Sequence, residues 1–318
     1  MTNNQQQMTN NKIVCLLPSA TEIVAALGLT EEIVGRSHEC DYPPEILNRP
    51  ICTTAQINSE QPSAQIDADI IDLVQKAISI YQLKTDVLEE LQPTHIITQD
   101  QCDVCAVNFD IVEKAVGELT SSHPQLVSLQ PNLLSEVWAD IEQVATKLGV
   151  SAQPLLTQLN SRVEACRQKT QALPDNKRPT VVGLEWTDPL MATGNWIPEL
   201  ISIAGGNSLL GAWGQHSPYL KWEQLVAADP EVIIIMPCGF DLDRTQVEGQ
   251  QLTQRLEWSS LQAVRNGKVY LADGNSYFNR PGPRLVDSLE ILAEILHPEL
   301  FHFGYQNTGW KRFEAGNA

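Results

Sequence analysis

The sequence predicts two related α/β lobes with parallel-type sheets, joined by a long rigid helix. Three observations support this fold class: a repeated helix and strand unit, an alternation of helical and strand patterns, and a helical pattern between the two halves. With 318 residues, of which 42% are hydrophobic, the chain is long enough to bury two cores.

The repeat is the strongest of these observations. LKTDVLEELQPTHIITQDQC begins at Leu83 and LKWEQLVAADPEVIIIMPCG begins at Leu220, an offset of 137 residues. Each copy predicts a short helix, a proline that ends it, a buried isoleucine-rich strand and a loop with a cysteine, as in parallel sheets covered on both faces. A weaker pair, TEIVAALGL and PELISIAGG, is offset by 177 residues. The first half therefore carries about 40 additional residues, which include His38, Cys40 and Cys52.

The first half opens with an apolar run that predicts a strand. Ser19 and Glu22 follow in the S-x-x-E spacing of a capping box, which predicts the start of a helix. Alternating strand and helix patterns then continue to the end of the first repeat copy. The predicted elements are strand 13–17, helix 19–27, strand 33–37, a long loop, helix 68–81, helix 86–91, strand 95–98 and helix 109–118.

The second half alternates in the same way, which favours a second α/β lobe. Its predicted elements are strand 180–184, helix 197–204, helix 222–227, strand 232–236, helices across 246–264, strand 268–271 and helix 284–296. Between the halves, residues 132–171 have a helical pattern, with Asn132 and Ser151 as N-caps and Gly149 ending the first piece. We therefore expect lobes at 12–130 and 176–306, a helical connection at 131–175, and weakly ordered tails at 1–11 and 307–318.

Charge and hydropathy exclude several classes of partner. The chain has 21 Lys and Arg against 39 Asp and Glu, a formal net charge of −18. This anionic field repels nucleic-acid phosphates and anionic membrane surfaces. The aliphatic run from Val232 to Met236 is far shorter than the ~20 apolar residues of a membrane-spanning helix. We expect a soluble monomer that neither binds nucleic acid nor inserts into a membrane.

The first eleven residues, MTNNQQQMTNN, lack the basic region and apolar core of a secretory signal. We therefore expect a cytoplasmic protein, with a periplasmic location as the alternative if the true start lies upstream. The seven cysteines are expected to be reduced thiols.

Several motifs together resemble the substrate-binding proteins of ABC importers for cobalamin, iron-siderophores and haem, in which a rigid helical backbone joins two α/β lobes. They are LLPSATEIVAALGL, QPTHIITQDQCDVCAV, WIPELISIAGG and LQAVRNGKVYLADGNSYFNRPGPRLVD, and the resemblance covers about residues 12–303. CDVCAV and NRPGPRLVD are most similar to members described as cobalamin-binding. The resemblance implies a small-molecule ligand in a cleft between the lobes, an ABC permease as a partner, no enzymatic activity and no obligatory cofactor.

Ligands of open parallel sheets bind beyond the carboxyl ends of the strands, so the loops there carry the candidate site. Aromatic residues are concentrated in these loops of the second lobe, although the whole chain is only 6% aromatic. A binding site with aromatic walls would match a flat corrin or porphyrin ring. Core packing is the alternative for these aromatic residues, capping for Ser19, and ordinary hydrogen bonding for His216, which could otherwise bind a ligand's metal axially. The predicted ligand-binding residues are Ser19, Tyr42, Glu185, Trp186, Trp196, Trp213, His216, Tyr219, Phe240, Tyr277, Phe278 and Arg280.

His38-x-Cys40 and Cys102-x-x-Cys105 each follow a predicted strand of the first lobe. Thiolate and imidazole ligands suit zinc or iron, so these four residues are candidate metal ligands. Redox activity of the CxxC pair and simple packing of small buried thiols are the alternatives.

The sequence contains no G-x-S-x-G, no Walker loop, no G-x-G-x-x-G after a strand and no H-E-x-x-H, which are common catalytic and nucleotide-binding motifs. The leading interpretation is a ligand-binding protein for a corrinoid, haem or another metal chelate. The alternatives are a cytoplasmic metal or redox protein that uses the His/Cys cluster, and an enzyme acting on a cobalamin-like molecule.

Overall fold

A computed structural model describes residues 11–76, 80–99, 109–119 and 121–314 of the chain. Their contacts divide the chain into two compact units. Unit 1 is formed by the described parts of Met1–Asn58, Ile70–Gln130 and Trp138–Leu156, and unit 2 by Ser59–Asp69, Pro131–Val137 and the described part of Thr157–Ala318. The two-lobe α/β fold class predicted from the repeat is confirmed.

Unit 1 is built on a parallel four-stranded sheet in the order β2-β1-β5-β6. Its central strands β1 and β5 are buried along their whole length, as the apolar run of β1 and the paired isoleucines of β5 predict. The core beside them holds Val14, Leu16, Leu88 and Ile96. The strands are β1 (Ile13–Cys15), β2 (Ile33–Arg36), β5 (His95–Gln99) and β6 (Gln125–Leu129), and the helices are α1 (Pro18–Ala26), α3 (Thr85–Leu91) and α4 (Phe109–Glu118).

The long loop of the first half contains more structure than its sequence predicts. Two short strands, β3 (Thr53–Ala55) and β4 (Tyr81–Leu83), pair antiparallel in unit 1. Helix α2 (Ser63–Gln75) begins five residues before the predicted helix start at residue 68. The long loop also holds a short 3-10 helix, η2 (Pro44–Ile46), and another, η1 (Thr30–Glu32), directly precedes β2.

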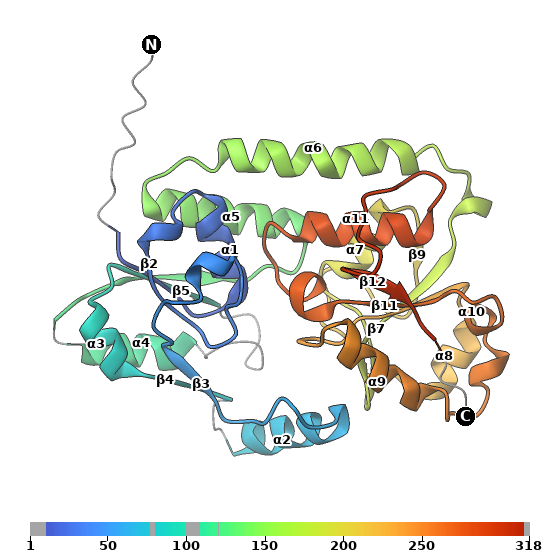
Figure 1. Ribbon diagram of the computed structural model, residues 1–318, viewed down its shortest axis with the longest axis horizontal. Coiled ribbons are helices and arrows are strands. Elements are labelled where there is room, and N and C mark those ends of the chain that lie inside the picture. The colour runs from blue at the N-terminus through green and yellow to red at the C-terminus, as the bar shows by residue number, and fades with distance from the viewer. Residues whose placement is uncertain (1–10, 77–79, 100–108, 120, 315–318) are drawn as a thin grey trace, which may run out of the picture. The chain divides into compact units, whose positions relative to one another are not determined.

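Unit 2 has a mixed sheet in the order β12-β11-β10-β7-β8, with β9 also paired to β7. The strands β7, β9, β10 and β11 are parallel, and the edge strands β8 and β12 are antiparallel. Figure 1 shows α7 and α11 on one side of this sheet and α8 and α9 on the other. The strands are β7 (Thr180–Thr187), β8 (Leu190–Ala192), β9 (Asn207–Ser208), β10 (Val232–Ile235), β11 (Val269–Ala272) and β12 (Trp310–Arg312).

The helices of unit 2 differ in how much they bury, and α11 is the most deeply buried of them. The α11 segment LVDSLEILAEIL is buried at every position except Asp287, because it packs on α7 and is covered further by the C-terminal segment. The helices are α7 (Ile197–Ile203), α8 (Trp222–Ala228), α9 (Leu242–Leu252), α10 (Gln262–Arg265) and α11 (Leu285–Leu296), with the short helices η3 (Asp175–Lys177), η4 (Trp258–Ser260) and η5 (Gly274–Phe278).

Two helices form the predicted helical connection. They are α5 (Leu134–Leu148) and α6 (Gln153–Thr170), and α6 has 18 residues. Gly149 follows α5 with φ +74°, a left-handed conformation that glycine adopts without steric cost. The boundary between the two units falls inside each of these helices.

The internal repeat corresponds to equivalent elements. Helices α3 and α8, and strands β5 and β10, begin 137 residues apart in sequence. Both helices end on a left-handed residue before a proline, Gln92 with φ 48° and Asp229 with φ 35°. The proline cannot continue the helix, so the chain turns directly into the buried strand in both copies.

Two local predictions are wrong. The capping box is not formed, because α1 already begins at Pro18 and its N-cap Leu17 makes no side-chain cap. The predicted weakly ordered tail contains β12, because the buried Trp310 indole donates a hydrogen bond to Glu294 Oε2 at 3.0 Å. Within the residues that the structure describes, no helix is long and apolar enough to cross a bilayer.

Candidate functional site

The carboxyl-end loops after β10 and β11 of unit 2 are bound to each other. The Asn275 amide donates to Phe240 O at 3.1 Å, and Asn279 Nδ2 donates to Met236 O at 3.4 Å and to Gly274 O at 3.0 Å. Asp273 accepts a hydrogen bond from the Ser276 amide at 2.7 Å, while burial raises the pKa of its carboxyl. These bonds fix the backbone from which the predicted site residues project.

Trp186, Phe240 and Arg244 form one stacked group. The Trp186 and Phe240 ring centroids are 5.1 Å apart, and the Arg244 guanidinium carbon lies 3.7 Å from the Phe240 centroid. Phe240 is buried between its two neighbours, whereas Trp186 is half-buried. A cation above one ring face and an indole beside it leave Phe240 little free surface.

The stacked group is contacted by Ser59–Asp69, a segment of the first half of the sequence that belongs to unit 2. We call it the docking segment. Arg244 donates from Nη1 to Ser59 O and from Nη2 to Gln61 O, the latter at 2.6 Å. The Trp186 Nε1–H donates to Ser63 O at 3.3 Å. These contacts place Trp186 and Arg244 beneath the chain's own backbone.

Ser63 is the most deeply buried part of this contact. Its hydroxyl donates to Glu248 Oε2 at 2.8 Å and lies 3.1 Å from Thr187 Oγ1. Gln251 Nε2 also donates to Glu248 Oε2, at 3.3 Å. The buried carboxylate of Glu248 is thus bound to neutral donors rather than to a cation.

Three predicted residues of the second lobe lie on one exposed loop. Trp213 is 53% exposed and Tyr219 is 58% exposed, and His216 between them is exposed as well. The Tyr219 hydroxyl donates to Asp67 Oδ1 of the docking segment at 3.0 Å. In the same region Glu185 accepts a hydrogen bond from Ser217 Oγ at 2.6 Å. This loop offers accessible aromatic surface beside fixed polar groups.

The remaining aromatic candidates of unit 2 are covered. Phe278 is fully buried, and Trp196 is buried with its Nε1–H donating to Phe278 O at 2.9 Å. Tyr277 is half-buried against Tyr305, with ring centroids 6.0 Å apart. Arg280 is buried and donates from Nη2 to Asn275 Oδ1 at 2.9 Å. Core packing therefore accounts for Trp196 and Phe278 in this structure.

Two predicted ligand residues are in unit 1. Ser19 is buried near the start of α1, and its hydroxyl has no hydrogen-bond partner in the described chain. Tyr42 is 44% exposed and precedes Pro43 through a cis peptide bond. Both residues are close in sequence to a strand end of the unit 1 sheet, as their sequence positions predict.

The candidate metal ligands are only partly described. His38 Nδ1 lies 2.7 Å from Thr53 Oγ1, and the Cys40 thiol accepts a hydrogen bond from Thr21 Oγ1 at 2.9 Å and donates to Cys15 O at 3.8 Å. Cys102 and Cys105 lie outside the described residues. No group of three or more His, Cys, Asp or Glu side chains suited to a metal ion occurs in the described part of the chain.

Two described thiols of unit 1, Cys15 and Cys52, are in surroundings that disfavour the thiolate. Burial, reinforced by Cys40, raises the pKa of Cys15 well above its ordinary value, and burial raises the pKa of Cys52 to about 11. Protonated thiols are poor nucleophiles and poor metal ligands. Cys15 lies inside β1, as predicted, and the redox interpretation is not favoured.

His38 gives a testable pH dependence. Burial, with Lys84 and Arg36 nearby, lowers its pKa from the usual 6.5, so the folded state prefers the neutral ring. Its contribution to stability is present above pH 6.5 and is lost as the pH falls below that value. We expect His38→Gln to reduce the loss of unfolding free energy between pH 7.5 and 5.5, measured by urea titration. His95, whose pKa is also lowered, should behave in the same direction, and exposed His123→Gln is the control. An equal loss in wild type and His38→Gln would contradict this assignment.

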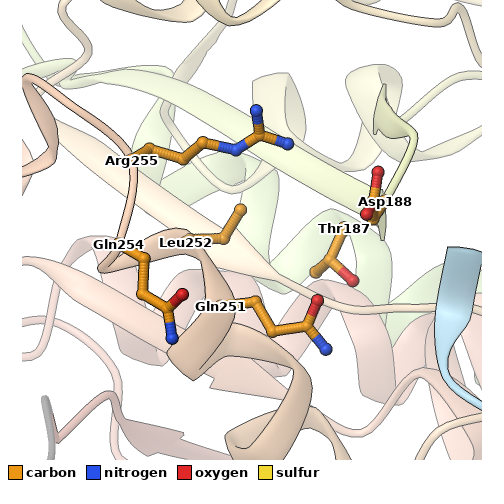
Figure 2. A pocket seen from close by; sticks show the side chains of 6 residues that line it. All are labelled: Thr187, Asp188, Gln251, Leu252, Gln254 and Arg255. Atoms are coloured by element: carbon orange, nitrogen blue, oxygen red, sulfur yellow. The ribbon is translucent and has the colours of Figure 1, made fainter.

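A polar pocket of about 410 Å³ in unit 2 adjoins the docking contact through Thr187 and Gln251 (Figure 2). Only one of its lining residues is apolar, so it lacks the aromatic or extended apolar wall that a flat macrocycle requires. We therefore do not place the ligand there. The lining residues are Thr187, Asp188, Gln251, Leu252, Gln254 and Arg255.

Sequence reasoning missed the docking segment and its anchors Ser63, Arg244 and Glu248. The signal that pointed to this region was the set of about 40 additional residues in the first half. These additional residues indicated that the first half contains an extra element. They did not indicate what the element contacts, because Glu248 and Trp186, which bind Ser63, are more than 100 residues away in sequence.

Comparison with known proteins shows the family. Residues 13–275 match the model of a family described as periplasmic binding protein. The chain is 24% identical over 298 residues to an uncharacterized ABC transporter substrate-binding lipoprotein, YvrC, of Bacillus subtilis, covering 91% of this chain and 81% of that protein. It is 23% identical over 298 residues to a vitamin B12-binding protein of Vibrio cholerae, covering 90% and 88%. A periplasmic haem-binding protein of Pseudomonas aeruginosa superposes with a TM-score of 0.68 at 18% identity, covering 91% and 93%.

The expectation of a cytoplasmic location is wrong. The matching family and the similar proteins are periplasmic or lipoprotein-type binding proteins, and the alternative, a periplasmic location, fits them. The expectation rested on a missing pattern in the first eleven residues, which is weaker evidence than a match across most of the chain.

The family consists of ligand-binding transport proteins that take small molecules and work with a permease, rather than of enzymes. The two α/β units, the 137-residue repeat and the match over residues 13–275 lead to the same conclusion. The chain belongs to the periplasmic binding protein family and is a substrate-binding protein of the ABC transporter type.

Proposed function

We propose that this protein binds a flat metal macrocycle, with a corrinoid first and haem second, and presents it to an ABC permease. The observation that carries the proposal is a set of aromatic side chains on the carboxyl-end side of unit 2, which we call the aromatic surface. Trp213 and Tyr219 are exposed, and the half-buried Trp186 packs on the buried Phe240. Aromatic faces bind flat, polarisable rings with little loss of conformational entropy. Relatives named for vitamin B12 and haem binding support this ligand class.

Trp213 is the residue best placed to contact a ligand first. Its side chain is 53% exposed, so a bound ring would remove apolar surface from water there. Glu185, held by Ser217, and the exposed His216 supply polar groups at the same edge. Ser19 and Tyr42 of unit 1 remain proposed ligand contacts, because both are close in sequence to a strand end of the unit 1 sheet. The buried Ser19 hydroxyl has no hydrogen-bond partner among the described residues.

Titration with hydroxocobalamin, haemin and ferrichrome tests the proposal. We expect saturable absorbance changes and tryptophan quenching with hydroxocobalamin, and about tenfold weaker binding in Trp213→Ala, because an aromatic contact contributes about 1 kcal/mol beyond its buried area. Leu256→Ala is the matched control, since Leu256 is an 81% exposed apolar residue of unit 2 outside the aromatic surface.

No saturable response to any of the three compounds would contradict the proposed function. Equal affinities in Trp213→Ala and Leu256→Ala would remove Trp213 from the site. Light scattering with and without ligand tests the further proposal that the protein acts as a monomer.

A further inference from the structure

The docking segment uses the groups that a ligand on the aromatic surface would need. The Trp186 indole N–H is bonded to Ser63 O, and the Tyr219 hydroxyl is bonded to Asp67. One face of Phe240 is covered by Arg244, which donates to Ser59 O and Gln61 O. Of the four aromatic residues proposed to bind ligand, Trp186 and Tyr219 thus bond to Ser59–Asp69 directly, and Phe240 is linked to it through Arg244.

The docking segment is bound to unit 2 mainly by hydrogen bonds rather than by buried apolar side chains. Only Ser63 and Ile66 are buried among the 13 residues of α2. The residues before α2, Asn58 to Pro62, read NSEQP, and the one apolar side chain among them, Pro62, is exposed. Hydrogen bonds exchanged with water contribute modestly to stability, so this contact can open without unfolding the core.

The position of the segment in the sequence agrees with a separate role. It lies among the about 40 additional residues that the first half carries relative to the second, outside the repeated helix and strand unit. The three described sheets are complete without it, because no residue of Ser59–Asp69 is in a strand. The segment can therefore leave unit 2 while the sheet and its helices remain.

We infer that Ser59–Asp69 is a built-in competitor, which occupies the aromatic surface of unit 2 in the empty protein and is displaced by the ligand. This inference rests on the proposed function and adds a regulation of the same site. The observed affinity then equals the intrinsic affinity reduced by the fraction of molecules in which the segment is released. Weakening the segment's contacts raises that fraction and tightens binding.

The test compares Arg244→Gln with wild type and with Arg265→Gln. Arg265 is an exposed arginine of α10 in unit 2, and its replacement changes the net charge equally. We expect Arg244→Gln to bind hydroxocobalamin five- to tenfold more tightly, because it loses two hydrogen bonds to the segment. Arg265→Gln should bind like wild type. Asp67→Ala, which frees Tyr219, should shift affinity in the same direction by about twofold.

Hydrogen exchange supplies a second readout. In wild type, saturating hydroxocobalamin should speed amide exchange across Ser59–Asp69, and Arg244→Gln should show fast exchange there without ligand. Protection of the segment by ligand, or binding in Arg244→Gln no tighter than in wild type, would overturn the inference and leave the proposed function standing. If Arg244→Gln does not fold, as judged by circular dichroism, Asp67→Ala decides the question alone. Failure of all these proteins to bind hydroxocobalamin, haemin or ferrichrome overturns the proposed function and, with it, the inference.

Discussion

Replacing Arg162 by methionine is expected to lower the free energy of unfolding of unit 2 by about 3 kcal/mol. Arg162, on α6, donates from Nη2 to Asp287 Oδ1 at 2.5 Å and to Glu290 Oε2 at 2.6 Å, and from Nε to Glu290 Oε1 at 2.9 Å. The two carboxylates are 19% and 8% exposed. Removing the cation leaves both of them partly desolvated without their main partner, which is the costly way to break such a pair.

No neighbouring group among the described residues can replace the Arg162 cation between the two carboxylates, and Tyr305 is the nearest other donor to both. The Tyr305 hydroxyl oxygen lies 3.1 Å from both Asp287 Oδ1 and Glu290 Oε2, so the two carboxylates share its single proton. Burial and the two carboxylates raise the pKa of Tyr305, and the hydrogen bonds to Glu290 and Asp287 raise that of Arg162. A neutral phenol has one proton to donate and cannot replace a guanidinium that bonds both carboxylates at once.

Urea unfolding followed by tryptophan fluorescence measures this effect. Six of the seven tryptophans belong to unit 2, and Trp138 is the exception. Arg167→Gln on the same helix is the control, because its pair with Glu164, at 3.7 Å, joins side chains that are about half exposed. Such a pair contributes about 0–1 kcal/mol. Similar losses in the two variants would show that the buried network contributes no more than an exposed pair.

The repeat explains why much of the fold could be predicted. Strand β10 is an unbroken valine and isoleucine run and strand β5 is centred on Ile96 and Ile97, and both begin two residues after a proline. A local pattern therefore specified their type and where they begin. Edge strands β8 and β12 were missed because their sequences are short and pair only after distant parts of the chain have folded.

The site was harder to predict for a related reason. The sequence predicts that Trp186 and Phe278 both lie at carboxyl ends of strands of the second lobe. It does not show that Phe278 is fully buried while Trp186 is half-buried and bonded to Ser63 O. The Ser63 and Glu248 hydrogen bond joins residues 185 positions apart, and neither residue belongs to a motif. Long-range polar contacts of this kind depend on side-chain positions that the tertiary fold determines.

We expect Gly274→Ala to lower the free energy of unfolding by about 3 kcal/mol, as much as the Arg162 replacement. A methyl group on Gly274 would overlap the carbonyl oxygen of Pro237 and come within 2.8 Å of the Met236 carbonyl oxygen. Both obstacles are backbone atoms, which cannot rotate away as a flexible side chain can. The loops after β10 and β11 must then separate.

That separation would also change the candidate site. Asn275 and Asn279 bind these two loops together through Phe240 O and Met236 O, so moving them displaces Phe240 relative to Trp186. We therefore expect Gly274→Ala to weaken hydroxocobalamin binding as well as stability, measured at a temperature where the variant is still folded. A stability loss with unchanged affinity would show that this loop pair does not position the ligand surface.

Gly117→Ala is the matched control for this prediction. Gly117 lies in α4 with nothing within 4 Å of the added methyl group, and it is exposed. An alanine in a helix loses less backbone entropy on folding than glycine, so this variant should be neutral or more stable by about 0.5–1 kcal/mol. The same chemical change should thus have opposite signs at the two positions, because only Gly274 faces backbone oxygens. Equal effects at both positions would rule out the close approach of the two loops as the cause.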